Sequence, residues 1–142
     1  MKRKTLSLLI ILFGIIFGCT HKKEEATATD SDEWKEMDSF HMIMAEVFHP
    51  YKDSSNLAPL KKLAEEMAFE ADKWASASLP SKVNNQKVKD ELQKLKTDTR
   101  SLADQIKTGA DDATIGSSLN SLHDSFHEIV EAWHGGGEKH EH

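Results

Sequence analysis

The sequence is poor in several residue types that common functions require. Cys19 is the single cysteine among 142 residues, which excludes a disulfide within the chain and a cluster of thiolate ligands. Glycine-rich phosphate loops and a serine in a nucleophile elbow are also missing, and no carboxylate pair clearly points into a predicted core. We therefore expect that the protein is not an enzyme.

Basic residues are the second shortage. The chain has 18 Lys and Arg against 24 Asp and Glu, and its basic cluster is residues 2–4. Such a chain is a poor partner for nucleic acid or for an anionic lipid surface, so no nucleic acid is expected among its partners. Segments with strand-like alternation and clusters of β-branched residues are absent as well, which predicts an all-α fold.

The amino-terminal segment has the parts of a secretory signal. Three basic residues, Lys2-Arg3-Lys4, precede an apolar run over residues 8–17, and Gly18 and Cys19 follow. The run is too short to span a bilayer comfortably. It therefore predicts a signal peptide rather than a membrane-spanning helix.

Residues 16–19 read Ile-Phe-Gly-Cys and resemble the bacterial lipobox, with an aliphatic residue three before the cysteine and a small residue directly before it. The resemblance implies that residues 1–18 are removed and that Cys19 becomes the lipid-anchored first residue of the mature chain. The membrane is then a partner through this lipid, in the bacterial cell envelope. Thr20 stands where an aspartate would suggest inner-membrane retention, which favours the outer membrane.

The mature chain divides into a tether, one domain and a tail. Removing the three basic signal residues leaves 15 basic against 24 acidic residues, a formal charge of −9. Residues 19–31 are polar and predict a flexible tether, and residues 32–134 predict the domain. Residues 135–142 form a glycine- and histidine-containing tail that we expect to be disordered, with His140 and His142 in solvent.

Apolar residues recur at three- and four-residue spacing in four segments of the domain. We expect helices over about residues 32–49, 56–79, 82–107 and 112–134. Pro50 is expected to end the first, Pro59 to lie in the first turn of the second and Gly109 to end the third. Short connections between amphipathic helices predict an antiparallel up-down-up-down four-helix bundle.

In an antiparallel bundle, each position along one helix can be paired with the position beside it on the neighbouring helix. The start of the first helix lies beside the end of the fourth, which brings Trp34, Trp74 and Trp133 to one end as an aromatic plug. His41 lies between Met37 and Met44 in sequence, and we place it near the centre of the apolar face. By the same matching His41 lies within about a turn of His123 and Phe126.

His123 and His127 stand four residues apart, a spacing that puts both imidazoles on one side of a helix. Together with His41 they predict a metal site, with Met44 as a secondary ligand and Met37 as another thioether nearby. Nitrogen and thioether ligands suit copper or zinc, and the soft sulfur favours reduced copper. The alternative is that these histidines and methionines only pack.

Residues 115–126, IGSSLNSLHDSF, resemble the last helix of cytochrome c′, whose haem-attachment segment is Cys-x-x-Cys-His followed by an acidic, a variable and an aromatic residue. On this chain the two cysteine positions are Leu119 and Leu122, and the haem-ligand position is His123. The resemblance implies a cytochrome c′-like bundle without covalent haem. A b-type relative in the same superfamily binds haem without thioether links. The resemblance to it implies that His123, paired with Met37 or His41, would be the ligands of a non-covalent haem.

The sequence thus leaves three functions open. We favour a cell-envelope lipoprotein that binds a copper or zinc ion through core histidines. A non-covalent haem-binding electron-transfer protein is the second, and a structural or interaction lipoprotein without a cofactor is the third.

Overall fold

The computed structural model describes residues 33–135 of the chain. The predicted signal peptide, the lipid-anchor residue Cys19, the tether and all of the tail beyond Gly135 lie outside these residues. Within residues 33–135 the structure has no helix that is both long enough and apolar enough to cross a membrane.

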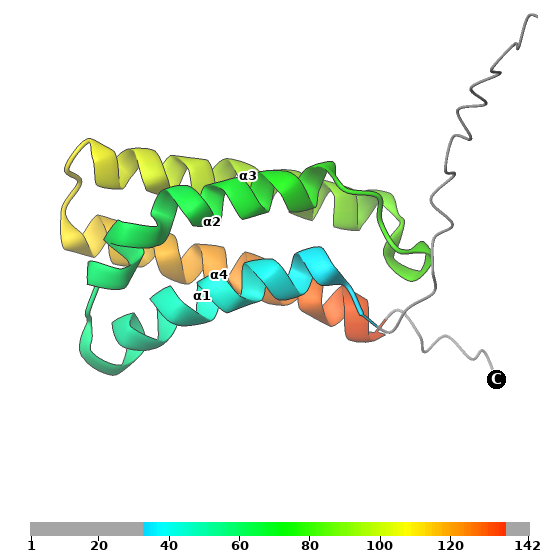
Figure 1. Ribbon diagram of the computed structural model, residues 1–142, viewed down its shortest axis with the longest axis horizontal. Coiled ribbons are helices and arrows are strands. Elements are labelled where there is room, and N and C mark those ends of the chain that lie inside the picture. The colour runs from blue at the N-terminus through cyan, green and yellow to red at the C-terminus, as the bar shows by residue number, and fades with distance from the viewer. Residues whose placement is uncertain (1–32, 136–142) are drawn as a thin grey trace, which may run out of the picture.

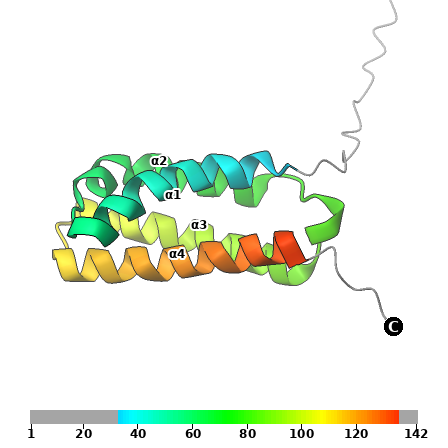
Figure 2. The same ribbon diagram turned by 90° about the horizontal axis from the view of Figure 1, so that it is seen from below.

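Four α-helices form an antiparallel bundle: α1 (Lys35–Ser54), α2 (Ala58–Ser76), α3 (Gln86–Lys107) and α4 (Asp112–Gly135). A short 3₁₀ helix, η1 (Ser81–Val83), lies in the connection between α2 and α3. Figures 1 and 2 show that successive helices run in opposite directions, so that the start of α1 and the end of α4 meet at one end. The predicted all-α four-helix bundle is confirmed.

The helix ends follow local capping chemistry. The Asn85 side chain accepts a hydrogen bond from the Val88 amide at 3.0 Å, a standard N-cap for α3. Asp111 does the same for the Thr114 amide before α4, at 2.9 Å. Gly109 has φ +79°, the left-handed conformation that glycine adopts without strain at a helix end. The predicted stop at Gly109 is therefore correct.

The prediction that Pro50 ends the first helix is wrong, because α1 continues through Ser54 with Pro50 inside it. Proline removes one N–H from the helical ladder, and only one turn follows it here. That turn closes with Ser55 in the left-handed conformation, with its amide donating to the Tyr51 carbonyl at 2.7 Å. The turn brings Tyr51 into contact with α4.

The interior of the bundle is aromatic and aliphatic. Phe40 is completely buried, with its ring centroid 5.7 Å from that of Trp74 and 5.5 Å from that of Phe126. The three tryptophans gather at one end as predicted, with Trp34 5.1 Å from Trp74 and 5.4 Å from Trp133 between ring centroids. Burial of these rings supplies much of the apolar area that stabilises the fold.

A close contact joins the C-terminal turn of α1 to the start of α4. Gly116 packs against the ring of Tyr51, and a Cβ added at Gly116 would lie 2.5 Å from the Tyr51 hydroxyl. Asn120 donates hydrogen bonds to that hydroxyl at 3.2 Å and to the Gly116 carbonyl at 3.0 Å. Glycine is thus required here for close approach.

Candidate functional site

The seam between α1 and α4 contains two adjoining cavities of about 330 and 120 Å³. Both are lined by His41, Phe126 and His127, so they form one continuous feature, which we call the α1/α4 groove. The backbones of α1 and α4 approach each other least among the four neighbouring helix pairs. Every histidine within residues 33–135 lines this groove, namely His41, His49, His123, His127 and His134.

His123 and His127 form a close pair on α4. Their Nε2 atoms lie 3.1 Å apart, and their ring planes are tilted by 66° with centroids 4.4 Å apart. The i, i+4 spacing puts both rings on one side of the helix, as predicted. Two nitrogens at this distance can share one proton, or they can bind one metal ion from two sides.

The ring of His123 is held in place from α1. Phe48 stacks on it, with centroids 3.6 Å apart and planes within 6°. The Asp124 carboxylate lies 3.8 Å from Nδ1 of His123 and favours a proton on that nitrogen. With the proton on Nδ1, the lone pair of Nε2 is available to a ligand.

The protonation of His123 is also biased by its surroundings. Its side chain is 25% exposed, and burial lowers the pKa of His123 below the ordinary value of 6.5, helped by the neighbouring charge of His127. Asp124 acts in the opposite direction but is the weaker influence. The neutral imidazole, which is the form that binds metals, therefore persists to a lower pH than in an exposed histidine.

The prediction that His41 lies at the centre of the apolar face is wrong. His41 is exposed, and the core positions of α1 are Met37, Phe40, Met44 and Val47. His41 is displaced by about 100° from Phe40 around the helix and lies on the side that faces α4. There it stacks on Phe126, with centroids 5.4 Å apart, and lines the same cavity as His123.

The methionines take different places. Met44 is only 1% exposed but lines the smaller cavity beside His123 and His127, whereas Met37 lines the larger one. The structure therefore does not bring Met37 and His123, a ligand pair for haem, into one cavity. The smaller cavity has the volume of roughly four water molecules.

The two leucines that the resemblance to cytochrome c′ aligns with its attachment cysteines are also packed. Leu119 and Leu122 are fully buried members of the hydrophobic core. Leu122 directly precedes His123 in sequence, and both leucine side chains lie in the interior of the bundle. The His123 side chain instead lines the α1/α4 groove.

The described part of the chain does not contain a complete metal site. Within residues 33–135 no three His, Cys, Asp or Glu side chains come close enough together to hold a metal ion. The His123–His127 pair offers two ring nitrogens to an ion, and within residues 33–135 a third ligand would require a side-chain movement.

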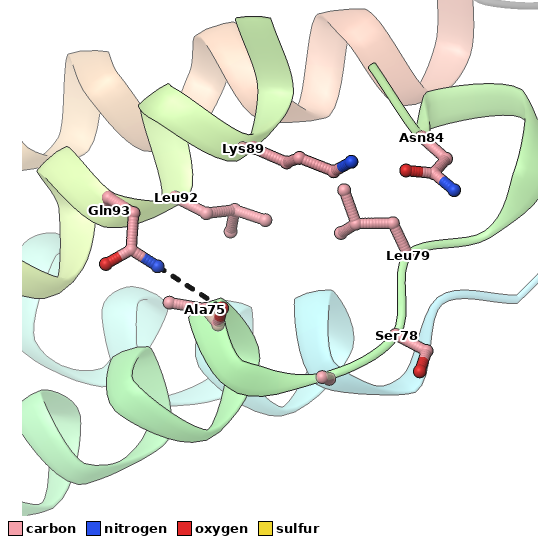
Figure 3. A pocket seen from close by; sticks show the side chains of 8 residues that line it. Ala75, Ser78, Leu79, Asn84, Lys89, Leu92 and Gln93 are labelled. Atoms are coloured by element: carbon pink, nitrogen blue, oxygen red, sulfur yellow. Dashed lines mark hydrogen bonds between the residues drawn. The ribbon is translucent and has the colours of Figure 1, made fainter. Parts of the chain in front are cut away.

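A further cavity, of about 430 Å³, lies at the other side of the bundle between the end of α2 and the start of α3. Figure 3 shows Lys89 pointing toward its mouth beside Asn84 and Leu79, while Gln93 donates a 3.4 Å hydrogen bond to the Ala75 carbonyl. Lys89 is the one titratable side chain among the residues that line it. A lone ammonium among amides and aliphatic groups offers no acid–base or nucleophile pair.

Sequence reasoning missed two residues of the groove. Phe48 was not among the predicted site residues, but its ring stacks on that of His123. His49 was not among them either, and it lines the smaller cavity. Their spacing of seven and eight from His41 is the signal that would have found them, because residues so spaced share a helix face.

Comparisons with known protein families, with curated proteins and with solved structures gave no match to this chain.

Proposed function

We propose that the protein is a lipid-anchored protein of the bacterial cell envelope that binds a transition-metal ion, copper or zinc, in the α1/α4 groove. His123 and His127 are the primary ligands. His41 is the third candidate ligand, and Met44 a secondary one. The protein acts as a binding module rather than as an enzyme.

The observation that carries this proposal is the 3.1 Å separation of the two Nε2 atoms. With metal–nitrogen bonds of about 2.0–2.1 Å, this separation corresponds to an N–metal–N angle of about 98°. That angle lies between the square-planar and tetrahedral values, so either geometry is reached with a small adjustment of the two side chains. The pair is thus spaced for an ion before any ion binds.

The environment of the pair supports the same function. A metal-binding histidine usually donates its other ring N–H to a carboxylate or carbonyl group. The Asp124 carboxylate lies 3.8 Å from Nδ1 of His123 and would take this role after a small side-chain movement. The Phe48 stack fixes the ring plane. Together they orient the ligand without requiring the metal.

The choice of metal depends on the remaining ligands. His41 is exposed and lines the same cavity, so a rotation of its side chain can bring a third nitrogen to the ion. Three nitrogens with an open position suit zinc or oxidised copper, whereas participation of the Met44 thioether favours reduced copper. The envelope location follows from the signal at residues 1–18 and from Cys19.

The test is a competition titration of the full chain with a coloured zinc chelator, repeated with Cu⁺. His127→Ala should weaken binding by about tenfold or more, because one of two primary ligands is lost. His134→Ala is the matched control, since His134 lies on the same helix two turns further on and is not part of the pair. Equal affinities for the chain and for His127→Ala would reject the proposal and favour an interaction lipoprotein whose histidines only pack.

A test of the anchor is independent of the metal. Cys19→Ala should abolish labelling of the protein with radioactive fatty acid and should release it from the membrane fraction of the producing bacterium. An unmodified Cys19 in the native protein, found by mass spectrometry, would contradict the lipoprotein assignment.

A further inference from the structure

The cavity between α2 and α3 is separate from the α1/α4 groove in position and in lining. It lies between the end of α2 and the start of α3, and neither His123 nor His127 lines it. Its volume of about 430 Å³ falls in the range of about 300–1,000 Å³ that is usual for small-molecule sites. That volume corresponds to about fourteen water molecules, which leaves room for a ligand of about ten non-hydrogen atoms.

The inner wall of this cavity is aliphatic. Leu92 is buried in the hydrophobic core, and Leu79 and Ala75 pack against that core. Figure 3 shows the side chains of Leu79 and Leu92 extending toward each other across the cavity. Such a wall favours a ligand with a hydrocarbon part, because apolar surface is stabilised when it leaves water.

The rim of the cavity is polar. Lys89 is the one charged residue among those that line it, and its ammonium group ends beside Leu79 and Asn84 (Figure 3). Asn84 and Gln93 add side-chain amides that can donate hydrogen bonds. Gln93 uses one N–H on the Ala75 carbonyl, but at 3.4 Å this bond is long and easily exchanged.

The ammonium group of Lys89 has no carboxylate partner within the described part of the chain. Two other basic residues of α3, Lys96 and Arg100, pair instead with Asp72 and Glu65 of α2. The first turn of α3 has no acidic residue, so the partial positive charge of the helix start is not offset there. The rim therefore has the charge that attracts an anion.

We propose that this cavity binds an aliphatic monocarboxylate, a fatty acid of about eight carbons, with its carboxylate on Lys89 and its chain against Leu79 and Leu92. One ammonium and the neutral amides of Asn84 and Gln93 match the single charge and the several lone pairs of a carboxylate. A fatty acid esterified in a lipid lacks the free carboxylate that Lys89 would bind. The site is independent of the proposed metal binding.

The test is a titration of the ¹⁵N-labelled full chain with octanoate, followed in ¹H–¹⁵N spectra. The side-chain amide signals of Asn84 and Gln93 should shift and reach a limit. Lys89→Met, which keeps a long apolar side chain, should weaken octanoate binding by about fivefold, the upper end for an exposed ion pair. Lys87→Met is the matched control, because Lys87 is also exposed on α3 but does not line the cavity, and it should bind as the unchanged chain does.

Octan-1-ol, which has the same chain without a charge, separates the carboxylate from the hydrocarbon. The unchanged chain should bind it about fivefold more weakly than octanoate, and Lys89→Met should bind it as the unchanged chain does. The inference is overturned by an absence of saturable shifts at Asn84 and Gln93, or by equal octanoate affinity in Lys89→Met and the unchanged chain. Equal weakening by Lys87→Met would also overturn it, as would equal affinity for octan-1-ol and octanoate. None of these results bears on metal binding by His123 and His127.

Discussion

The seams on opposite sides of the bundle are built differently. Between α2 and α3, three small residues, Ala64, Ala68 and Ala103, are buried together. They let the two helices approach closely, because the interaxial distance depends on the side chains at the contact. Ion pairs of Arg100 with Glu65 and of Lys96 with Asp72 bridge the same seam at 2.7 and 2.5 Å. The α2/α3 seam is closely packed along its middle, and its cavity of about 430 Å³ lies only between the end of α2 and the start of α3.

Between α1 and α4 the side chains are large and the backbones are further apart. Aromatic rings from both helices, such as Phe48 and Phe126, hold the helices apart and leave the two cavities lined by histidines. The two seams therefore differ in what lines their cavities. Histidines line those between α1 and α4, whereas Lys89 is the one titratable residue that lines the cavity between α2 and α3.

The largest expected effect distinguishes neighbouring residues of α1. Phe40→Ala should lower the free energy of unfolding by about 3–5 kcal/mol, because it leaves a cavity among fully buried rings. His41→Ala should change it by less than about 1 kcal/mol, because His41 is an exposed residue at the rim of the groove. Urea unfolding followed by circular dichroism measures both. Equal losses at the two positions would contradict the orientation of α1.

The contact of Gly116 with Tyr51 gives the next largest effect. Helix propensity alone predicts that Gly116→Ala stabilises α4 by up to about 1 kcal/mol. The 2.5 Å approach of the new Cβ to the Tyr51 hydroxyl predicts instead a loss of about 1–3 kcal/mol. Gly135→Ala is the matched control, since nothing lies within 4 Å of its added Cβ. A stabilised Gly116→Ala protein would show that α1 and α4 do not meet there.

A smaller effect concerns pH, in protein kept free of metal with a chelator. Because the pKa of His123 is lowered in the folded state, the unfolded chain takes up a proton first as the pH falls below 6.5. The contribution of His123 to the free energy of unfolding is therefore fully present above about pH 6.5. It is lost as the pH falls through the lowered pKa of His123. His123→Gln should flatten this part of the stability profile between pH 8 and 5. Equal slopes in His123→Gln and the unchanged chain would contradict the lowered pKa of His123.

The smallest effect belongs to the α2/α3 seam. A double-mutant cycle on Arg100 and Glu65 should give a coupling energy of about 0.2–1 kcal/mol, since both side chains are exposed. The coupling should decrease in 0.5 M salt, because salt screens exposed charges. A coupling above about 2 kcal/mol, or one that salt leaves unchanged, would show that this ion pair is more than a surface contact.

Much of the fold could be predicted from spacing alone. The four helices, the gathering of Trp34, Trp74 and Trp133, and the His123–His127 pair all follow from helical periodicity and antiparallel order. The phase of α1 could not be predicted so easily, because Phe40, Val47 and Phe48 are all apolar and allow two neighbouring stripes. Long-range packing of Phe40 on Trp74 and Phe126 selects between the stripes, and that choice moves His41 to the rim.

The Pro50 error has a different cause. Proline is unfavourable inside a helix because it removes a hydrogen bond and crowds the preceding turn. Pro50 lies near the end of α1, and the turn that follows it places Tyr51 against Gly116. Such a contact joins residues 65 positions apart, and a local pattern does not reveal it.

The central claim, that His123 and His127 together bind a metal ion, is tested most directly by nitrogen NMR of the histidine side chains. Long-range ¹H–¹⁵N spectra of the full chain are recorded while Zn²⁺ is added to one equivalent. We predict that the Nε2 resonances of His123 and His127 shift together and reach their limit at one equivalent. Nδ1 of His123 should keep its proton throughout, as its position beside Asp124 requires. Unchanged resonances for these two rings, or shifts confined to other histidines, would contradict the claim.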